Sequence, residues 1–316
     1  MIEQSGMPSS KEIGHPQTRT VDSLVSSFKK MAFQARALAE ATDILEEMVR
    51  DKECVRILSL AGALVPGGLR SLIAGTIRHR IFDIVVTTGA NVTHDAIESL
   101  GYRHLVPKKL PSDAALFKSG RSRIYDVLIP RAAFMALEKQ VGEVLDSLQK
   151  TTTASMFLTS LAKRLKDRYS ILAAALESDV PIFCPTLVDS ALGVMLSTQE
   201  EDKTIDSFKD RKMLIERLWE SKTSGILILG GGAPKNFAFQ SMEVTSKGFD
   251  YAVQVTTDRA EFGGLSGASL SEAISWGKVK KDAKTMEVFC DATIAFPLMI
   301  AALEERLSES FDIRGA

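Results

Sequence analysis

The stretch GILILGGGAPKN, residues 225–236, is a short apolar run that leads through three glycines into a helix-compatible segment. Five other apolar runs of strand length are VRILSLAG (55–62), IFDIVVTTGA (81–90), VPIFCPT (180–186), DYAVQVTT (250–257) and MEVFCDA (286–292). Helical candidates lie between them, around residues 69–79, 93–100, 132–149, 158–168, 205–222, 234–243, 269–275 and 294–307. Strands that are apolar on both faces and alternate with helices predict a doubly wound α/β fold with a mainly parallel sheet.

The N-terminal part of the chain has a different pattern. Residues 1–20 are polar, contain Gly, Pro and Ser, and lack apolar periodicity, which predicts a mobile arm. From residue 21 to residue 50 apolar residues recur at three- and four-residue steps, which predicts a helical cap. Since no strong break in composition follows, we expect residues 21–316 to form a single domain that includes this cap.

Composition excludes several classes of protein. The net charge of −1 gives no overall basic field, so nucleic acid is not expected as a partner. No apolar run reaches the roughly 20 residues of a membrane span, and the N-terminus lacks a secretory signal, so we expect a cytoplasmic protein. The three cysteines are far apart and the four histidines show no ligand spacing, so neither a disulfide framework nor a metal site is predicted.

Ligands of doubly wound sheets bind beyond the carboxyl ends of the strands, where loops meet helix N-termini. Six such ends carry glycines, threonines and aspartates here, which suits an elongated ligand such as a dinucleotide. Backbone N–H groups of residues 230–232 could bind a pyrophosphate, and Asp189 or Asp291 could bind ribose hydroxyls. The glycines could equally form a tight turn, the aspartates could cap helices, and no GxGxxG follows the first strand.

Lys278 directly follows Gly277 and Trp276, the second and last tryptophan. A lysine amine held against an indole in a dry pocket is a candidate nucleophile, because burial favours the neutral amine that attacks carbon. The same lysine in the charged run that continues with Lys280 and Lys281 would be a solvated surface group. Taken alone, the residues favour the surface interpretation.

Five stretches, taken in order, change this interpretation: VVTTGANVTHD (85–95), ILGGGAPKN (228–236), YAVQVTTD (251–258), SGASLSEAISWGKV (266–279) and VFCDATIAFPL (288–298). Together they resemble the successive signature blocks of the deoxyhypusine synthase family, and the similarity runs from about residue 50 to about residue 307. The combination of EAISWGK with DATIAFPL is the specific part. The resemblance implies a Rossmann-like fold of the deoxyhypusine synthase type.

The resemblance also implies a reaction. In that family the lysine of the SWGK motif attacks an imine made from a polyamine, which makes Lys278 the nucleophile by position. NAD would take a hydride from spermidine, Lys278 would displace 1,3-diaminopropane and hold the aminobutyl group, and an acceptor amine would receive it. Glu272 would be the ionic partner of the polyamine, and the Trp276 indole could bind a cationic amine.

Residues at the family's NAD-contacting positions follow from the same resemblance. They are Thr88, Gly89, Asp189, Gly231, Gly232, Thr257, Ser266, Asp291 and Ala292. The resemblance further implies a homotetramer, built as a dimer of dimers, with its active sites at subunit interfaces.

Three positions depart from the hypusine-forming enzymes. Asn236 stands where they have a histidine in the polyamine pocket, and an amide cannot shuttle a proton near neutral pH. Val194 and Leu265 stand where they have acids. These features resemble a prokaryotic branch of the family in which some members use a free diamine.

The sequence therefore leaves three functions open. The first is an NAD-dependent aminobutyl transferase whose acceptor is a lysine on a translation factor or a free diamine such as putrescine. The second is an NAD-binding protein of the same fold with little or no turnover, which acts by association. The third, an unrelated nucleotide-binding hydrolase, would require the SWGK resemblance to be accidental.

Overall fold

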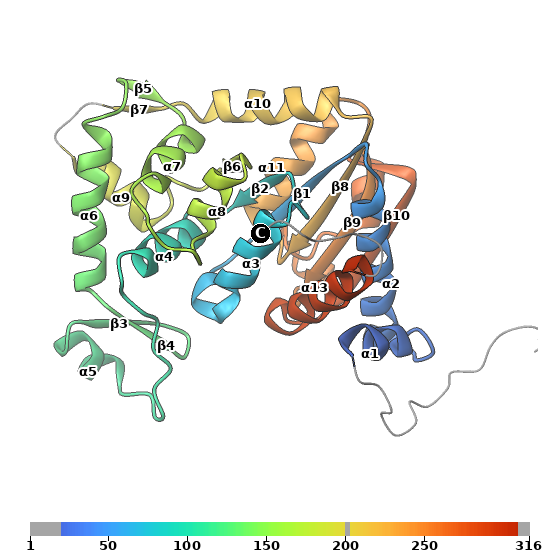
Figure 1. The fold of residues 1–316 in the computed structure, drawn as a ribbon, viewed down its shortest axis with the longest axis horizontal. Helices are drawn as coiled ribbons and strands as arrows, with labels where there is room; N and C mark the ends of the chain where they lie inside the picture. Colours follow the sequence, from blue (N-terminus) through green and yellow to red (C-terminus); the bar gives the residue numbers. More distant parts are fainter. Residues whose placement is uncertain (1–19, 200–202, 309–316) are drawn as a thin grey trace, which may run out of the picture.

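The computed structural model describes residues 20–199 and 203–308, coloured along the chain in Figure 1. Its centre is a six-stranded sheet in the order β10-β9-β8-β1-β2-β6. Every neighbouring pair in this sheet is parallel. The strands are β1 (Cys54–Leu60), β2 (Ile84–Thr87), β6 (Ile182–Phe183), β8 (Thr223–Leu229), β9 (Phe249–Thr256) and β10 (Val279–Phe289).

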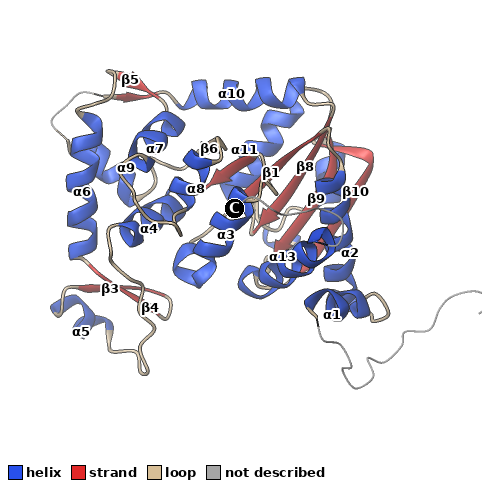
Figure 2. Cartoon of the chain, viewed as in Figure 1, coloured by secondary structure: helices blue, strands red, loops and turns tan. Residues whose placement is uncertain are grey.

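Both faces of the central strands are buried because successive side chains point to opposite sides of the sheet. On β1, Ile57 packs in the core that contains helices α10 (Ser207–Glu220), α11 (Gly232–Glu243) and α12 (Leu270–Ser275). The next residue, Leu58, packs in the core that contains α2 (Phe33–Arg50), α3 (Arg70–Arg78) and α13 (Ala292–Ser308). Figure 2 shows the strands as a twisted layer between helices. The doubly wound, mainly parallel α/β fold expected from the sequence is confirmed.

The strand order reverses between β1 and β8. From β1 the chain proceeds outward through β2 to β6, and it then returns to place β8 on the other side of β1. At such a reversal the loops that follow the two central strands diverge and leave a crevice beyond their carboxyl ends. The fold therefore opens a cleft between the loop after β1 and the loop after β8.

A group of helices and short strands extends the molecule beyond the β6 edge, at the left of Figure 1. Asp95, which is buried, accepts hydrogen bonds from Arg70 Nε (2.7 Å) on α3 and from the backbone N–H groups of Ile171 (3.0 Å) and Leu172 (2.9 Å). It therefore holds three helices together. The elements of this region are α4 (Gly89–Ser99), α5 (Asp113–Lys118), β3 (Arg121–Ile124), β4 (Val127–Pro130), α6 (Ala132–Leu145), β5 (Thr151–Thr152), α7 (Ala154–Ala162), α8 (Ile171–Glu177), α9 (Ala191–Ser197) and β7 (Thr204–Ile205).

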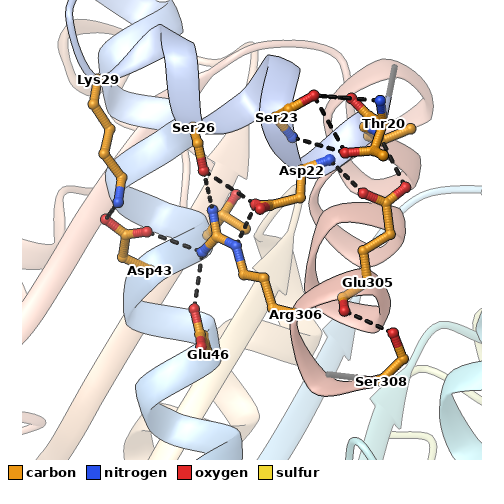
Figure 3. A network of polar contacts seen from close by, with 12 residues as sticks. Thr20, Asp22, Ser23, Ser26, Lys29, Asp43, Glu46, Glu305, Arg306 and Ser308 are labelled. Carbon is orange, nitrogen blue, oxygen red and sulfur yellow. Dashed lines mark hydrogen bonds and ion pairs between the residues drawn. The ribbon is translucent and has the colours of Figure 1, made fainter. Parts of the chain in front are cut away.

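The N-terminal helices α1 (Val21–Phe28) and α2 are fixed to the C-terminal helix α13. Arg306 on α13 donates from Nε to Asp22 Oδ1 on α1 (2.5 Å) and from one terminal nitrogen to Asp43 Oδ1 on α2 (2.9 Å), as Figure 3 shows. Glu305 accepts the backbone N–H of Asp22 at 2.8 Å. The helices expected over residues 21–50 are present, and α2 also packs on β10.

Two expectations about elements need correction. The last strand was expected at 286–292, but β10 begins at Val279 and therefore includes Lys280 and Lys281. Since β10 is an edge strand, it tolerates charged residues, which hid it in the sequence pattern. The short helices α5, α8 and α9 were not expected. Most of the arm predicted over residues 1–20 lies outside the described residues, and Thr20 caps α1. No helix between residues 20 and 308, within the described ranges, is long and apolar enough to span a membrane.

Candidate active site

The cleft at the strand-order reversal, called here the switch-point cleft, has a volume of about 380 Å³. Its walls are the loops that follow β1, β8, β9 and β10. Five residues that the sequence assigned to NAD binding line it: Gly231, Thr257, Ser266, Asp291 and Ala292. The fold thus gathers residues from Ala61 to Thr293, which are far apart in the chain, into one cavity.

The glycine turn at the end of β8 forms one wall of this cleft. Gly231 lies so close to the loop after β9 that an added Cβ would be 2.5 Å from Ser266 Cα, so no larger residue fits. Gly231 is also the N-cap of α11, and within the described residues no side-chain cap bond is made at this helix start. A helix N-terminus in this state presents N–H groups to an anion.

The other four residues expected at the cofactor lie beside this cleft. Thr88 Oγ1 donates to the carbonyl of Gly62, a cleft residue, at 2.7 Å. Gly89 begins α4, and a Cβ there would be 2.4 Å from Ser190 Cβ, so the loop that carries the exposed Asp189 packs directly on Gly89. Gly232 is the first residue of α11. Thr88 therefore borders the cleft, whereas Gly89 and the Asp189 loop lie next to Thr88 and line no part of the cleft.

A second, smaller cavity of about 60 Å³, called here the lysine pocket, lies between α11 and α12. All four residues expected at the polyamine line it: Asn236, Glu272, Trp276 and Lys278. Their positions depend on the start of α12. Ser269 Oγ accepts the backbone N–H of Glu272 at 3.0 Å, and Glu287 on β10 accepts the N–H of Leu270. These caps fix the turn that carries Glu272.

Lys278 follows α12 and is largely but not fully enclosed, since its side chain is 15% exposed. Its Nζ lies 4.9 Å from the centre of the Trp276 ring and 3.4 Å from Glu243 Oε2. Trp276 itself is 58% exposed. The expected dry pocket around the indole is therefore incomplete in the single chain, because Trp276 ends a surface helix and faces outward.

Sequence analysis missed two charged residues near Lys278. Glu243, at the end of α11, is its ion-pair partner. Lys235, in the first turn of α11, lines the lysine pocket and is only 4% exposed. Both lie on α11, which the sequence identified as a helix without showing which of its faces meets α12. The one available signal was the position of Lys235, a lysine placed just after the glycine turn.

The departures from the family pattern lie in different places. Asn236 and Leu265 line the lysine pocket. Val194 is 62% exposed on α9 and contributes to the lining of neither cavity. Asp258, an acid that could compensate for a missing carboxylate, lines the switch-point cleft and not the lysine pocket. Of the two positions that lack an acid, Leu265 and Val194, only Leu265 can therefore contact an amine bound in the lysine pocket.

Comparison with known proteins identifies the family of the chain. The family model "Deoxyhypusine synthase" matches residues 23–303. Probable deoxyhypusine synthase 1 of Archaeoglobus fulgidus is 42% identical over 290 residues, which cover 92% of this chain and 96% of the relative. A deoxyhypusine synthase-like protein of Chlorobaculum tepidum is 36% identical over 308 residues, covering 92% and 87%.

The fold has a counterpart among solved structures. The crystal structure of a candidate deoxyhypusine synthase from Entamoeba histolytica superposes with a TM-score of 0.65 at 19% identity, covering 92% of this chain and 95% of that chain. At this identity the superposition supports the fold, whereas the family model and the sequence relatives establish the kinship. The chain belongs to the deoxyhypusine synthase family.

Proposed function

We propose that this protein transfers the aminobutyl group of spermidine, in an NAD-dependent reaction and through an imine at Lys278, to an acceptor amine. The observation that carries the proposal is the lysine pocket, which places Lys278, Glu272, Asn236 and Trp276 together beside the switch-point cleft. Ser266 lines the cleft and its neighbour Leu265 lines the pocket, so the two cavities meet at one loop.

The switch-point cleft fits a dinucleotide. The uncapped N-terminus of α11 and the close approach at Gly231 suit a pyrophosphate, since backbone N–H groups can reach it there without an intervening side chain. Asp291 accepts two hydrogen bonds from Thr293 through Oδ1, and Oδ2 makes no bond within the described residues and can accept a ribose hydroxyl. When bound, NAD would supply the oxidation of the polyamine by accepting a hydride.

The chain's own residues supply binding and the nucleophile. The Glu272 carboxylate lines the pocket and can accept hydrogen bonds from a substrate ammonium group, and the Trp276 ring offers a cation–π contact of roughly 0.5–2 kcal/mol. Lys278 must separate from Glu243 and lose one proton, which the Glu243 carboxylate can accept, before its neutral amine attacks carbon. Its amine then forms a C–N bond with the oxidised polyamine carbon, and the bond from that carbon to the departing 1,3-diaminopropane nitrogen breaks.

The acceptor is a protein lysine, as on a translation factor, or a free diamine such as putrescine. A small acceptor suits a pocket of about 60 Å³ in which Leu265 replaces an acid. The same substitution favours the second candidate function, an NAD-binding protein with little or no turnover, because a missing carboxylate weakens the hold on a cationic amine. A measurement of catalytic turnover distinguishes the transferase from the binding protein.

We further propose that the active protein is a homotetramer with its sites at subunit interfaces. Three large apolar side chains stand exposed around the two cavities: Phe262 (79%), Trp276 (58%) and Leu265 (48%). Large exposed apolar side chains are common at interfaces when they form a patch, and Phe262 and Leu265 belong to the same loop. A second subunit placed over this surface would complete the dry environment that the single chain leaves open at Trp276.

One experiment tests the function directly. Purified protein is incubated with NAD and spermidine, with no acceptor, with putrescine and with the translation factor in turn, and the products are identified by mass spectrometry. Sustained release of 1,3-diaminopropane without an acceptor supports the transferase. NAD binding without any such release supports the binding protein instead.

A further inference from the structure

Lys235 is a buried lysine for which the proposed reaction has as yet no role. It lies in the first turn of α11, lines the lysine pocket together with Lys278 and Glu272, and is 4% exposed. Burial of a lysine without a carboxylate in hydrogen-bonding contact is costly, and lysines are rarely buried in this way. A role in the reaction would explain why a lysine is buried at this position.

The Lys235 amine is held by two neutral oxygen atoms. Its Nζ donates to Gln254 Oε1 on β9 at 2.8 Å and to the carbonyl oxygen of Ala268, another residue of the pocket wall. A neutral amine has two N–H groups, and these two acceptors satisfy both. The third tetrahedral position of the nitrogen then carries a lone pair. Nζ lies 5.7 Å from the centre of the Phe239 ring, which also lines the pocket, and within the described residues no further polar side chain contacts this position.

Gln254 is itself fixed in orientation. Its Nε2 donates to the carbonyl oxygens of Gly230 (2.9 Å) and Ser266 (2.8 Å), so its Oε1 must face Lys235. Gln254 is only 1% exposed, and Gly230 and Ser266 both line the switch-point cleft. Gln254 is a positioning residue that presents an uncharged acceptor to Lys235 and connects the two cavities.

The surroundings of Lys235 lower the pKa of its amine toward neutral pH. Burial lowers the pKa of Lys235 to about 8, and the charge of Lys278 acts in the same direction. Glu287 on β10 and Glu272 on α12 oppose this by raising the pKa. A substantial share of Lys235 is therefore neutral at mildly basic pH, in contrast to a solvated lysine with its pKa of about 10.4.

We propose that Lys235 is the proton acceptor and donor of the amine site, a role that the neighbouring Asn236 cannot fill. The inference rests on the proposed function. The lone pair of neutral Lys235 takes the proton of the secondary ammonium group of spermidine, which leaves the free amine that oxidation requires. When the bond between the Lys278-bound carbon and the departing nitrogen breaks, Lys235 returns that proton to the nitrogen of 1,3-diaminopropane. One proton is taken up and one is returned, so Lys235 ends this step neutral, as it began, while the aminobutyl group stays on Lys278.

The test uses the full chain with NAD and spermidine and measures the release of 1,3-diaminopropane as a function of pH. The variants are Lys235→Ala and Lys235→Arg. The matched control is Lys280→Ala, which removes a half-buried lysine that pairs with Asp250 outside the lysine pocket. NAD affinity and thermal stability are measured for each variant, so that misfolding is detected separately.

We expect the kcat of the parent to rise with pH through about 8, since the neutral amine is the active form. Lys235→Ala should lose about 100-fold or more in kcat and lose this pH dependence, because general acid–base catalysis contributes about 10²–10⁴-fold. A small primary amine such as ethylamine should restore part of the rate. Lys235→Arg should be as inactive as Lys235→Ala, since a guanidinium group stays protonated.

The results that would contradict the role of Lys235 can be distinguished from those that would contradict the proposed function. If Lys235 only tied the Ala268 loop to α11, Lys235→Arg would retain activity and ethylamine would restore nothing, and either result overturns the proton-transfer role. Parental kcat and pH dependence in Lys235→Ala also overturn it, while the proposed function stands. A parent protein that releases no 1,3-diaminopropane overturns the proposed function and this inference together.

Discussion

Replacement of Glu272 by glutamine tests whether the lysine pocket holds the polyamine. The variant keeps the size of the side chain and the backbone cap from Ser269, and it removes only the charge. A charge-assisted hydrogen bond contributes about 1.5–3 kcal/mol. Glu272 is exposed in the single chain, so solvent screens its charge and the lower value of about 1.5 kcal/mol applies. This corresponds to about a tenfold rise in the apparent KM for spermidine.

The assay is steady-state kinetics with spermidine and NAD varied in turn. The KM for NAD should change little, since Glu272 does not line the switch-point cleft. Glu261→Gln is the matched control, because Glu261 is an exposed acid that lines neither cavity. Equal changes in the two KM values, or no change for spermidine, would show that the amine is bound elsewhere.

The same variant has a second readout. Glu272 raises the pKa of Lys235, so removal of its charge lowers that pKa below its value of about 8 in the parent. If Lys235 must be neutral, the rise of kcat with pH should move to lower pH in Glu272→Gln. A shift to higher pH would contradict the sign of this interaction.

Four further predictions follow from the site and the fold. Lys278→Ala should abolish transfer and leave NAD affinity nearly unchanged, and borohydride treatment of the spermidine-loaded parent should add an aminobutyl group at Lys278; an adduct on another lysine contradicts the assignment. Leu265→Asp should lower the apparent KM for spermidine by restoring a carboxylate to the pocket, and an unchanged or higher KM argues against this. Asp95→Ala should reduce the free energy of unfolding by about 3–5 kcal/mol in urea denaturation, since it leaves the buried charge of Arg70 without its closest partner; a loss below about 1 kcal/mol would refute this. Light scattering should detect a homotetramer, and a fully active monomer would refute the proposed assembly.

Much of the fold could be predicted because its signals are local. Apolar runs such as GILIL (225–229) must be buried on both faces, and their alternation with helices leaves a doubly wound parallel sheet as the simplest arrangement. The start of β10 at Val279 could not be predicted, because an edge strand with one face in water carries the same charged residues as a loop. The short helices α8 and α9 are stabilised by contacts with distant segments, as the hydrogen bonds that Asp95 accepts from the N-terminus of α8 illustrate.

Only part of the candidate site could be predicted from the sequence. Glycines with a local steric requirement, such as Gly231, and a lysine within a family motif, Lys278, were identified before the structure. Lys235 and Glu243 were not, since a charged residue on an amphipathic helix is solvated by default and only packing decides otherwise. The sequence likewise did not show that Leu265 reaches the pocket and Val194 does not.

The sequence by itself determined the class of fold, the family and the lysine that acts as the candidate nucleophile, because these depend on periodicity and on short motifs. Only the tertiary structure determined which charged side chains lie close together. The parallel strands bring the loop after β9 and the start of α11 together, and this contact buries Lys235 between Gln254 and Ala268. Protonation of an amine depends on burial and on neighbours from several elements, which no linear pattern encodes. The proton chemistry of this site is therefore a property of the assembled sheet and its helices.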